Sequence, residues 1–216
     1  SIDTQSGAGS AGDVDLAALT RITGSAANAD LDIDTSGAAG GAVDLPAVDG
    51  STARLHTLDV TTAAGTSTTL HGDVLLDDDG GGNPASFTVS GNGDVILSDD
   101  TAGDALTIET EAGDTAGVDG GAVDLASSNL YADAAGQDLV IDTSTGAAGR
   151  TGGSVTLALV DDNSGADAFL DTLDVDAAAA IDGQIDLSGN LLVNADAASQ
   201  ATSAIRLAGD VDTNGN

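Results

Sequence analysis

The sequence lacks cysteine, methionine, tryptophan and lysine altogether. Without cysteine, the chain can form neither a disulfide nor a thiol-based site. Without lysine, only four arginines oppose 36 acidic residues, which gives a formal net charge of −32. A surface of this sign repels a phosphate backbone and an anionic bilayer, so nucleic acid and anionic membranes are excluded as partners. The four basic residues are Arg21, Arg54, Arg150 and Arg206.

Aromatic residues are almost absent too, since the sequence has only Phe87, Tyr131 and Phe169. A thick globular core usually recruits aromatic side chains, because each buries about 150–250 Å². Hydrophobic residues nevertheless make up 41% of the chain. We therefore expect a thin, layered interior filled by aliphatic side chains. No apolar run reaches the roughly 18 residues of a membrane-spanning helix, so no membrane insertion is predicted.

A short unit of two strands recurs four times. Its first strand ends in Ile-acid-Thr, a turn of Gly, Ala and Ser follows, and a second strand then begins with glycine. Apolar residues alternate with polar ones in both strands, which is typical of half-buried β-strands. The sequence therefore predicts an all-β protein. The first strands end at residues 2–4, 33–35, 108–110 and 141–143, and the second strands cover residues 12–16, 41–45, 121–125 and 153–157.

A longer period lies above this unit. Residues 31–36 match residues 139–144 at an offset of 108. We interpret residues 1–216 as one continuous repetitive segment built of two units of about 108 residues, about 1–108 and 109–216. The end of the sequence is in phase with its beginning, because the strand at 204–207 resembles the one at 94–97. The segment is therefore expected to belong to a longer array or to stack head to tail on copies of itself.

Two architectures fit this pattern. The first is a parallel β-helix, or β-solenoid, whose coils of roughly 20–30 residues stack about 4.8 Å apart. The alternative is a tandem of two β-sandwich domains. We favour the solenoid because strand motifs recur inside each unit, aromatic core residues are scarce, and small Gly and Ala turns suit tight corners.

The succession of Leu-x-Ile-Asp-Thr, a Gly/Ala-rich turn and Gly-Gly-x-Val-x-Leu resembles the repeats of very large bacterial surface exoproteins. These are the filamentous-haemagglutinin-like adhesins and related β-strand-repeat proteins, and the resemblance covers essentially the whole chain. It implies a right-handed β-helix, secretion, and a role in adhesion, biofilm or surface fibres. It carries over no catalytic residue. The acidity adds the expectation of a prokaryotic source in a saline environment, where salt screens the self-repulsion.

Two acidic segments are candidate metal sites. Asp210, Asp212 and Asn214 match the opening of an EF-hand-like calcium loop, in which oxygen-bearing side chains at alternate positions wrap a hard cation. The glutamate that such a loop needs at its twelfth position is missing. Asp77 and Asp79 form the second candidate, because adjacent carboxylates repel and a cation would relieve that repulsion. Calcium is thus the one cofactor that the sequence suggests, and a hydrated acidic turn is the alternative at each place.

Motifs of catalysis are weak. Residues 7–12 match a dinucleotide-binding fingerprint, but a strand follows them where that motif needs a helix. His56 and His71 are the only imidazoles, and we interpret both as surface residues. We predict that the protein is not an enzyme.

The sequence as a whole predicts a structural extracellular fibre or adhesin segment. It would pair end to end with copies of itself or with further repeats of the same chain. The alternative is a calcium-stiffened adhesin module that recognises a glycan or a protein on a surface.

Overall fold

The computed structural model describes residues 1–4, 10–26, 28–50, 53–79, 82–98, 105–112, 118–145, 148–161, 168, 170–177, 184–187, 205–208 and 210–212. These residues form strands and turns and contain no helix, which confirms the predicted all-β class. Their strands pair in parallel throughout, and the one antiparallel contact among them is the isolated bridge between Ala132 and Ala168. Parallel stacking confirms the β-solenoid, because sandwich domains are antiparallel.

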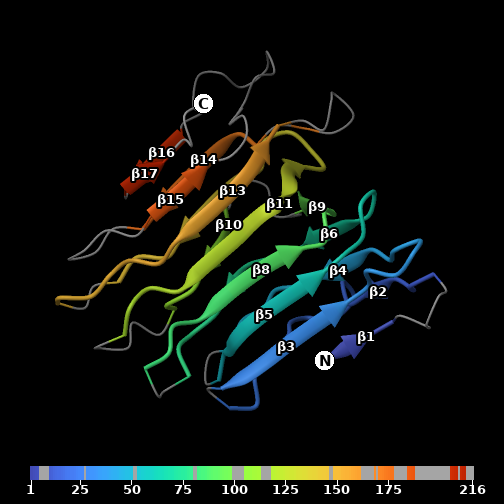
Figure 1. Ribbon diagram of the computed structural model, residues 1–216, viewed down its shortest axis with the longest axis horizontal. Helices are drawn as coiled ribbons and strands as arrows, with labels where there is room; N and C mark the ends of the chain where they lie inside the picture. Colours follow the sequence, from blue (N-terminus) through green and yellow to red (C-terminus); the bar gives the residue numbers. More distant parts are fainter. Residues whose placement is uncertain are drawn as a thin grey trace.

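Three ladders of stacked strands form the solenoid (Figure 1). The first contains β1 (Ile2–Asp3), β3 (Ala29–Asp34), β5 (Leu55–Thr61), β8 (Ser86–Ser90), the start of β11 (Ala122–Ala132), β13 (Val155–Val160), β15 (Gln184–Leu187) and β17 (Asp210–Asp212). The second contains β2 (Val14–Asp15), β4 (Val43–Leu45), β6 (Ser67–Leu70), β9 (Asp94–Leu97) and the end of β11. The third contains β7 (Val74–Leu75), β10 (Ala105–Glu109), β12 (Asp138–Asp142), β14 (Thr172–Asp176) and β16 (Ile205–Ala208). Isolated bridges extend the third ladder from Val74 to Val48 and Ile22.

Each ladder turns one apolar face inward, so the core consists of columns of aliphatic side chains. Alternate residues are buried in β8, β9 and β10, as the period of two predicts. Branched aliphatic side chains pack well on parallel strands, and burying one fully contributes about 1.5–3 kcal/mol. Phe87 is the one aromatic residue in the hydrophobic core cluster of the described residues. One column of the first ladder contains Leu58, Phe87, Val123, Val155 and Ile185, each in register with the next.

The threonine of the Ile-acid-Thr motif explains the repeat in physical terms. The hydroxyl of Thr35 donates a hydrogen bond of 2.7 Å to the carbonyl oxygen of Gly41, the glycine that precedes β4. Thr143 donates in the same way to Gly153, at 3.0 Å. We call this contact the threonine–glycine clasp. Thr4 donates in the same way to Gly12, at 2.8 Å, so the clasp joins residues six, eight or ten apart in its three copies. The two ends of the turn are thus held together while its length varies.

The glycine of the clasp also lies against the neighbouring coil. A Cβ atom on Gly41 would be 2.2 Å from the carbonyl oxygen of Gly12, and one on Gly153 would be 1.6 Å from that of Gly121. Real Cβ atoms do not approach a backbone oxygen so closely. Glycine is therefore required at these corners because two backbones meet there.

The segments that match at an offset of 108 residues lie on different sides of the solenoid. Residues 31–34 belong to β3 in the first ladder, whereas the matching residues 139–142 belong to β12 in the third ladder. The similarity therefore follows the local strand–turn–strand unit and not a fixed position on the solenoid. The division into two units of about 108 residues stays a prediction.

Thr68 is a polar exception in a core column. It lies in register between Val43 and Val95, it is fully buried, and its hydroxyl has no hydrogen-bond partner among the described residues. A buried hydroxyl without a partner costs about 1–3 kcal/mol. We expect Thr68→Val, which keeps the shape of the side chain, to raise the free energy of unfolding by about 1 kcal/mol in urea denaturation. Thr69→Val on the outward face of the same strand is the control and should change it little. Equal effects of the two substitutions would contradict this account.

Candidate functional site

An acidic corner follows the third ladder. Asp77 and Asp78 come shortly after β7, and Glu111 comes shortly after β10 on the next coil. Backbone hydrogen bonds from Leu76 to Glu109 (2.8 Å) and from Ala112 to Leu76 (3.0 Å) hold the two turns side by side. As a result, carboxylate oxygens of Asp77, Asp78 and Glu111 lie within 4.8 Å of one another. Asp78 is only 4% exposed and Glu111 only 2%.

Arginine side chains lie beside this corner. Nη1 of Arg54 is 3.6 Å from Oδ2 of Asp77, and its Nε is 3.8 Å from Oδ1 of Asp49. Nη1 of Arg21 is 3.9 Å from the other oxygen of Asp49. These ion pairs form a row of alternating charge, Arg21, Asp49, Arg54 and Asp77, which contains two of the four arginines. Arg54 is shared between two aspartates, so the corner keeps an excess of negative charge. Its three carboxylates are oxygen ligands of the kind that Ca²⁺ prefers.

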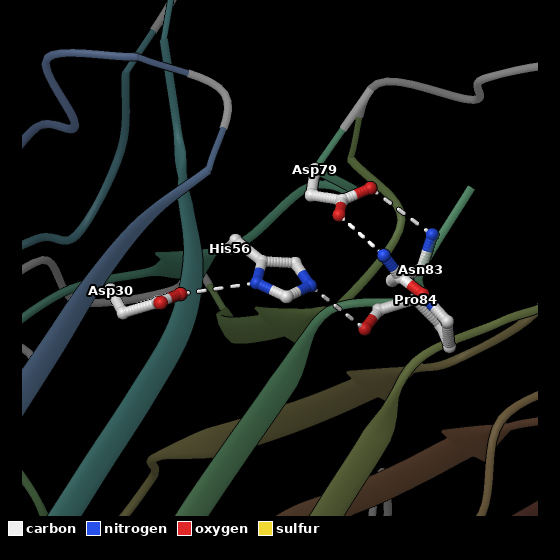
Figure 2. Close-up of polar contacts among 5 residues, drawn as sticks. All are labelled: Asp30, His56, Asp79, Asn83 and Pro84. Atoms are coloured by element: carbon white, nitrogen blue, oxygen red, sulfur yellow. Dashed lines mark hydrogen bonds and ion pairs between the residues drawn. The ribbon is translucent and has the colours of Figure 1, made fainter. Parts of the chain in front are cut away.

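The residues that the sequence predicted as metal ligands do not come together at one site in the structure. Asp77 belongs to the acidic corner, but Asp79 closes the turn that follows it. The backbone N–H of Asn83 donates to Oδ1 of Asp79 at 3.1 Å, and its side-chain amide donates to Oδ2 at 2.5 Å (Figure 2). Asp210 and Asp212 lie in β17, which pairs with β15. Asn214 lies outside the described residues, so the calcium loop at residues 210–216 stays a prediction.

His56 lies at a second polar site, on a β-bulge of the first ladder. Ala29 pairs with Leu55 and Asp30 pairs with Thr57, so His56 is the extra residue of β5. A bulge re-aims the side chain that it inserts. Nδ1 of His56 is 3.0 Å from Oδ1 of Asp30, and Nε2 is 3.2 Å from the carbonyl oxygen of Pro84 (Figure 2). The side chain is 17% exposed, so His56 is far less of a surface residue than the sequence suggested.

This geometry brings together an Asp–His pair and a carbonyl group. Burial tends to raise the pKa of Asp30, but hydrogen bonds with Thr57 and His56 and attraction to the His56 charge lower it overall. The Pro84 carbonyl takes the place that a hydroxyl nucleophile has in a Ser–His–Asp site. His71 is held less closely than His56. Its Nε2 is 3.7 Å from Oδ1 of Asp44, and its side chain is 30% exposed.

A shallow depression crosses the coils at the start of β8, β11, β13 and β15. Its lining includes three glycines and Asp119. Oδ1 of Asp119 accepts a hydrogen bond of 3.0 Å from the backbone of Thr151 and is 4.0 Å from Nη1 of Arg150. The lining residues are Pro84, Ala85, Ser86, Asp119, Gly120, Ala122, Thr151, Gly152, Gly153, Ser154 and Gln184.

Comparison with protein-family models, with curated proteins and with solved structures gives no match for this chain. The fold and the two polar sites define it as an acidic parallel β-solenoid. The resemblance to filamentous-haemagglutinin-like exoproteins stays a prediction from the sequence. Among the described residues, no helix has the length and the apolar character that crossing a membrane requires.

Proposed function

We propose that this chain is a structural segment of an extracellular fibre or adhesin stalk, and that it extends by pairing end to end with coils of its own kind. The observation that supports this most is the regularity of the stack. Parallel ladders continue through the described residues from β1 to β17, and successive strands stay paired despite the register shifts between β3 and β5 and between β11 and β13. Stacks of this kind add coils by the same contacts that hold them together.

The first coil presents a surface that suits such an addition. Among the described residues, β1 pairs with β3 alone and β2 pairs with β4 alone. The outer edges of β1 and β2 therefore offer backbone groups to a further strand. Beside them, Ile2, Leu16 and Ile22 are partly exposed, and Leu19 is 52% exposed. Leu19 is the one exposed large hydrophobic residue in the described part of the chain.

The sides of the solenoid disfavour the competing, lateral mode of association. Outward positions carry aspartates that face each other on adjacent coils, as Asp32 and Asp59 do in the first ladder and Asp15 and Asp44 do in the second. Two such surfaces repel each other when they approach side by side. Association through the ends meets less of this charge, so a thin filament is the expected product and a disordered aggregate is not.

Electron microscopy with variants of the first coil tests this function. The wild-type chain should form rods of uniform width that are longer than one chain. The double variant Ile2→Lys/Leu19→Lys places two charges on the end surface, and we expect it to remain a folded monomer in light scattering. Ala126→Lys/Ser127→Lys adds the same charge at two exposed lateral positions and should leave the rods intact. Isolated wild-type monomers of 20.7 kDa at every concentration, or equal behaviour of the two variants, would overturn the proposal.

A further inference from the structure

We propose that His56 is a pH-dependent clamp that ties three successive coils together when its ring is protonated. The ring belongs to β5, its Nδ1 contacts Asp30 of β3, and its Nε2 contacts the carbonyl of Pro84, which precedes β8. These three strands are consecutive in the first ladder. The bulge makes this reach feasible, because the extra residue turns its side chain away from the ordinary inward and outward positions.

The number of N–H groups on the His56 ring decides which protonation state can make both hydrogen bonds. The Asp30 carboxylate and the Pro84 carbonyl can only accept hydrogen bonds. A neutral imidazole carries one N–H group, so it can donate to one of them and turns a lone pair toward the other. An imidazolium carries two N–H groups and donates to both. Only the protonated ring therefore satisfies both contacts, and deprotonation opens one side of the clamp.

Most of the charged groups around the ring are acidic. Asp30 faces it from β3, and its lowered pKa keeps it ionised throughout the range in which an imidazole titrates. Asp79 lies in the turn before Pro84, with both carboxylate oxygens accepting from Asn83. Asp32 and Asp59 follow on β3 and β5. Arg54, the one nearby cation among the described residues, is directed to Asp49 and Asp77. The ring thus stands in a mainly negative environment.

The sign of the pH dependence follows from the bonds. Both contacts need the protonated ring, so the stabilisation that they give is present at low pH and one contact is lost when the ring gives up a proton at higher pH. Carboxylates in general titrate below this range, and comparison between variants removes what they contribute.

Thermal unfolding at pH 5.5 and pH 8.0, in NaCl at constant concentration, tests the clamp. The melting temperature of the wild-type chain should fall between these pH values by several degrees more than that of His56→Gln. His71→Gln is the matched control, because His71 has only a loose contact with Asp44, and it should keep the wild-type difference. Identical pH dependence in the wild type and His56→Gln would overturn the proposal.

Nuclear magnetic resonance of the wild-type chain gives a second test that needs no variant. The ring nitrogens of His56 should both have the ¹⁵N shifts of N–H groups at pH 5.5, and one of them should lose its proton as the pH rises. A single neutral tautomer of His56 at pH 5.5 would also overturn the proposal. Should His56→Gln fail to fold, Asp30→Asn takes its place in the melting experiment and should likewise reduce the pH difference.

Discussion

Replacement of Gly153 by alanine should destabilise the solenoid by on the order of 3 kcal/mol or more in urea denaturation. The added Cβ atom would lie 1.6 Å from the carbonyl oxygen of Gly121, 2.6 Å from its carbonyl carbon and 2.9 Å from the carbonyl carbon of Gly120. All three atoms are backbone, so no side chain can rotate out of the way. The two coils must separate, and the packing between β11 and β13 loosens with them.

The same substitution would also disturb the threonine–glycine clasp. Gly153 accepts a hydrogen bond from the hydroxyl of Thr143 and donates its N–H to the carbonyl of Thr143 at 2.8 Å. Both bonds are inside the corner, where water cannot easily replace them. The steric and polar effects therefore have the same sign.

Gly12→Ala is the matched control, because Gly12 has the same place in the motif. A Cβ atom on Gly12 would have nothing within 4 Å. This substitution should change the free energy of unfolding by less than about 1 kcal/mol. Gly41→Ala, whose Cβ atom would be 2.2 Å from the Gly12 oxygen, should resemble Gly153→Ala. Similar effects of Gly12→Ala and Gly153→Ala would show that close contact between coils is not the reason for glycine.

The sequence predicted the local unit well but not the ladder to which each copy belongs. Alternation of apolar and polar residues determines which side chains face inward, and the Ile-acid-Thr and Gly-x-Val-x-Leu patterns correspond to strands and to the clasp between them. All three ladders need the same inward and outward alternation. The pattern therefore cannot distinguish β3 from β12, although the two strands contain matching residues on different ladders.

The two polar sites depend on contacts between coils, which the order of residues along the chain does not predict. Asp77 was found because acidic residues adjoin it in sequence. Glu111 was missed because only the parallel stacking of one coil on the next brings it there. His56 had a signal that could have been used, since Leu55 and Leu58 are both buried and lie three residues apart. That spacing breaks the period of two and indicates a bulge, but the contacts with Asp30 and Pro84 depend on the neighbouring coils.

Raising the NaCl concentration from 10 mM to 1 M should raise the melting temperature of this chain by about 10 °C or more. A net charge of −32 is distributed over a narrow solenoid, and aspartates on adjacent coils face each other at the strand spacing of about 4.8 Å. The screening length falls from about 30 Å to about 3 Å over this change of salt. The repulsion that opposes folding is therefore largely removed at high salt, whereas the buried aliphatic core is retained.

Acidification should have an effect in the same direction, and this links the salt response to particular carboxylates. Burial raises the pKa of Asp59, with Asp32 and Asp30 adding repulsion, and burial likewise raises the pKa of Asp94. A carboxyl group with a raised pKa contributes stability at low pH that is lost as the pH rises through its folded value. The melting temperature in 10 mM NaCl should therefore be higher at pH 4.5 than at pH 7, and the gain from added NaCl should be smaller at pH 4.5.

Comparison of CaCl₂ with NaCl distinguishes general screening of charge from binding of calcium at a site. At matched ionic strength, CaCl₂ and NaCl should raise the melting temperature equally if screening is the whole effect. An additional rise with CaCl₂ that Glu111→Gln removes would instead assign cation binding to the acidic corner of Asp77, Asp78 and Glu111, because this substitution takes away one of its three carboxylates. A melting temperature that does not respond to NaCl at pH 7 would contradict the claim that repulsion among the aspartates opposes folding. The acidic faces would then carry no net repulsion, and the charge could not be what keeps neighbouring solenoids from associating side by side.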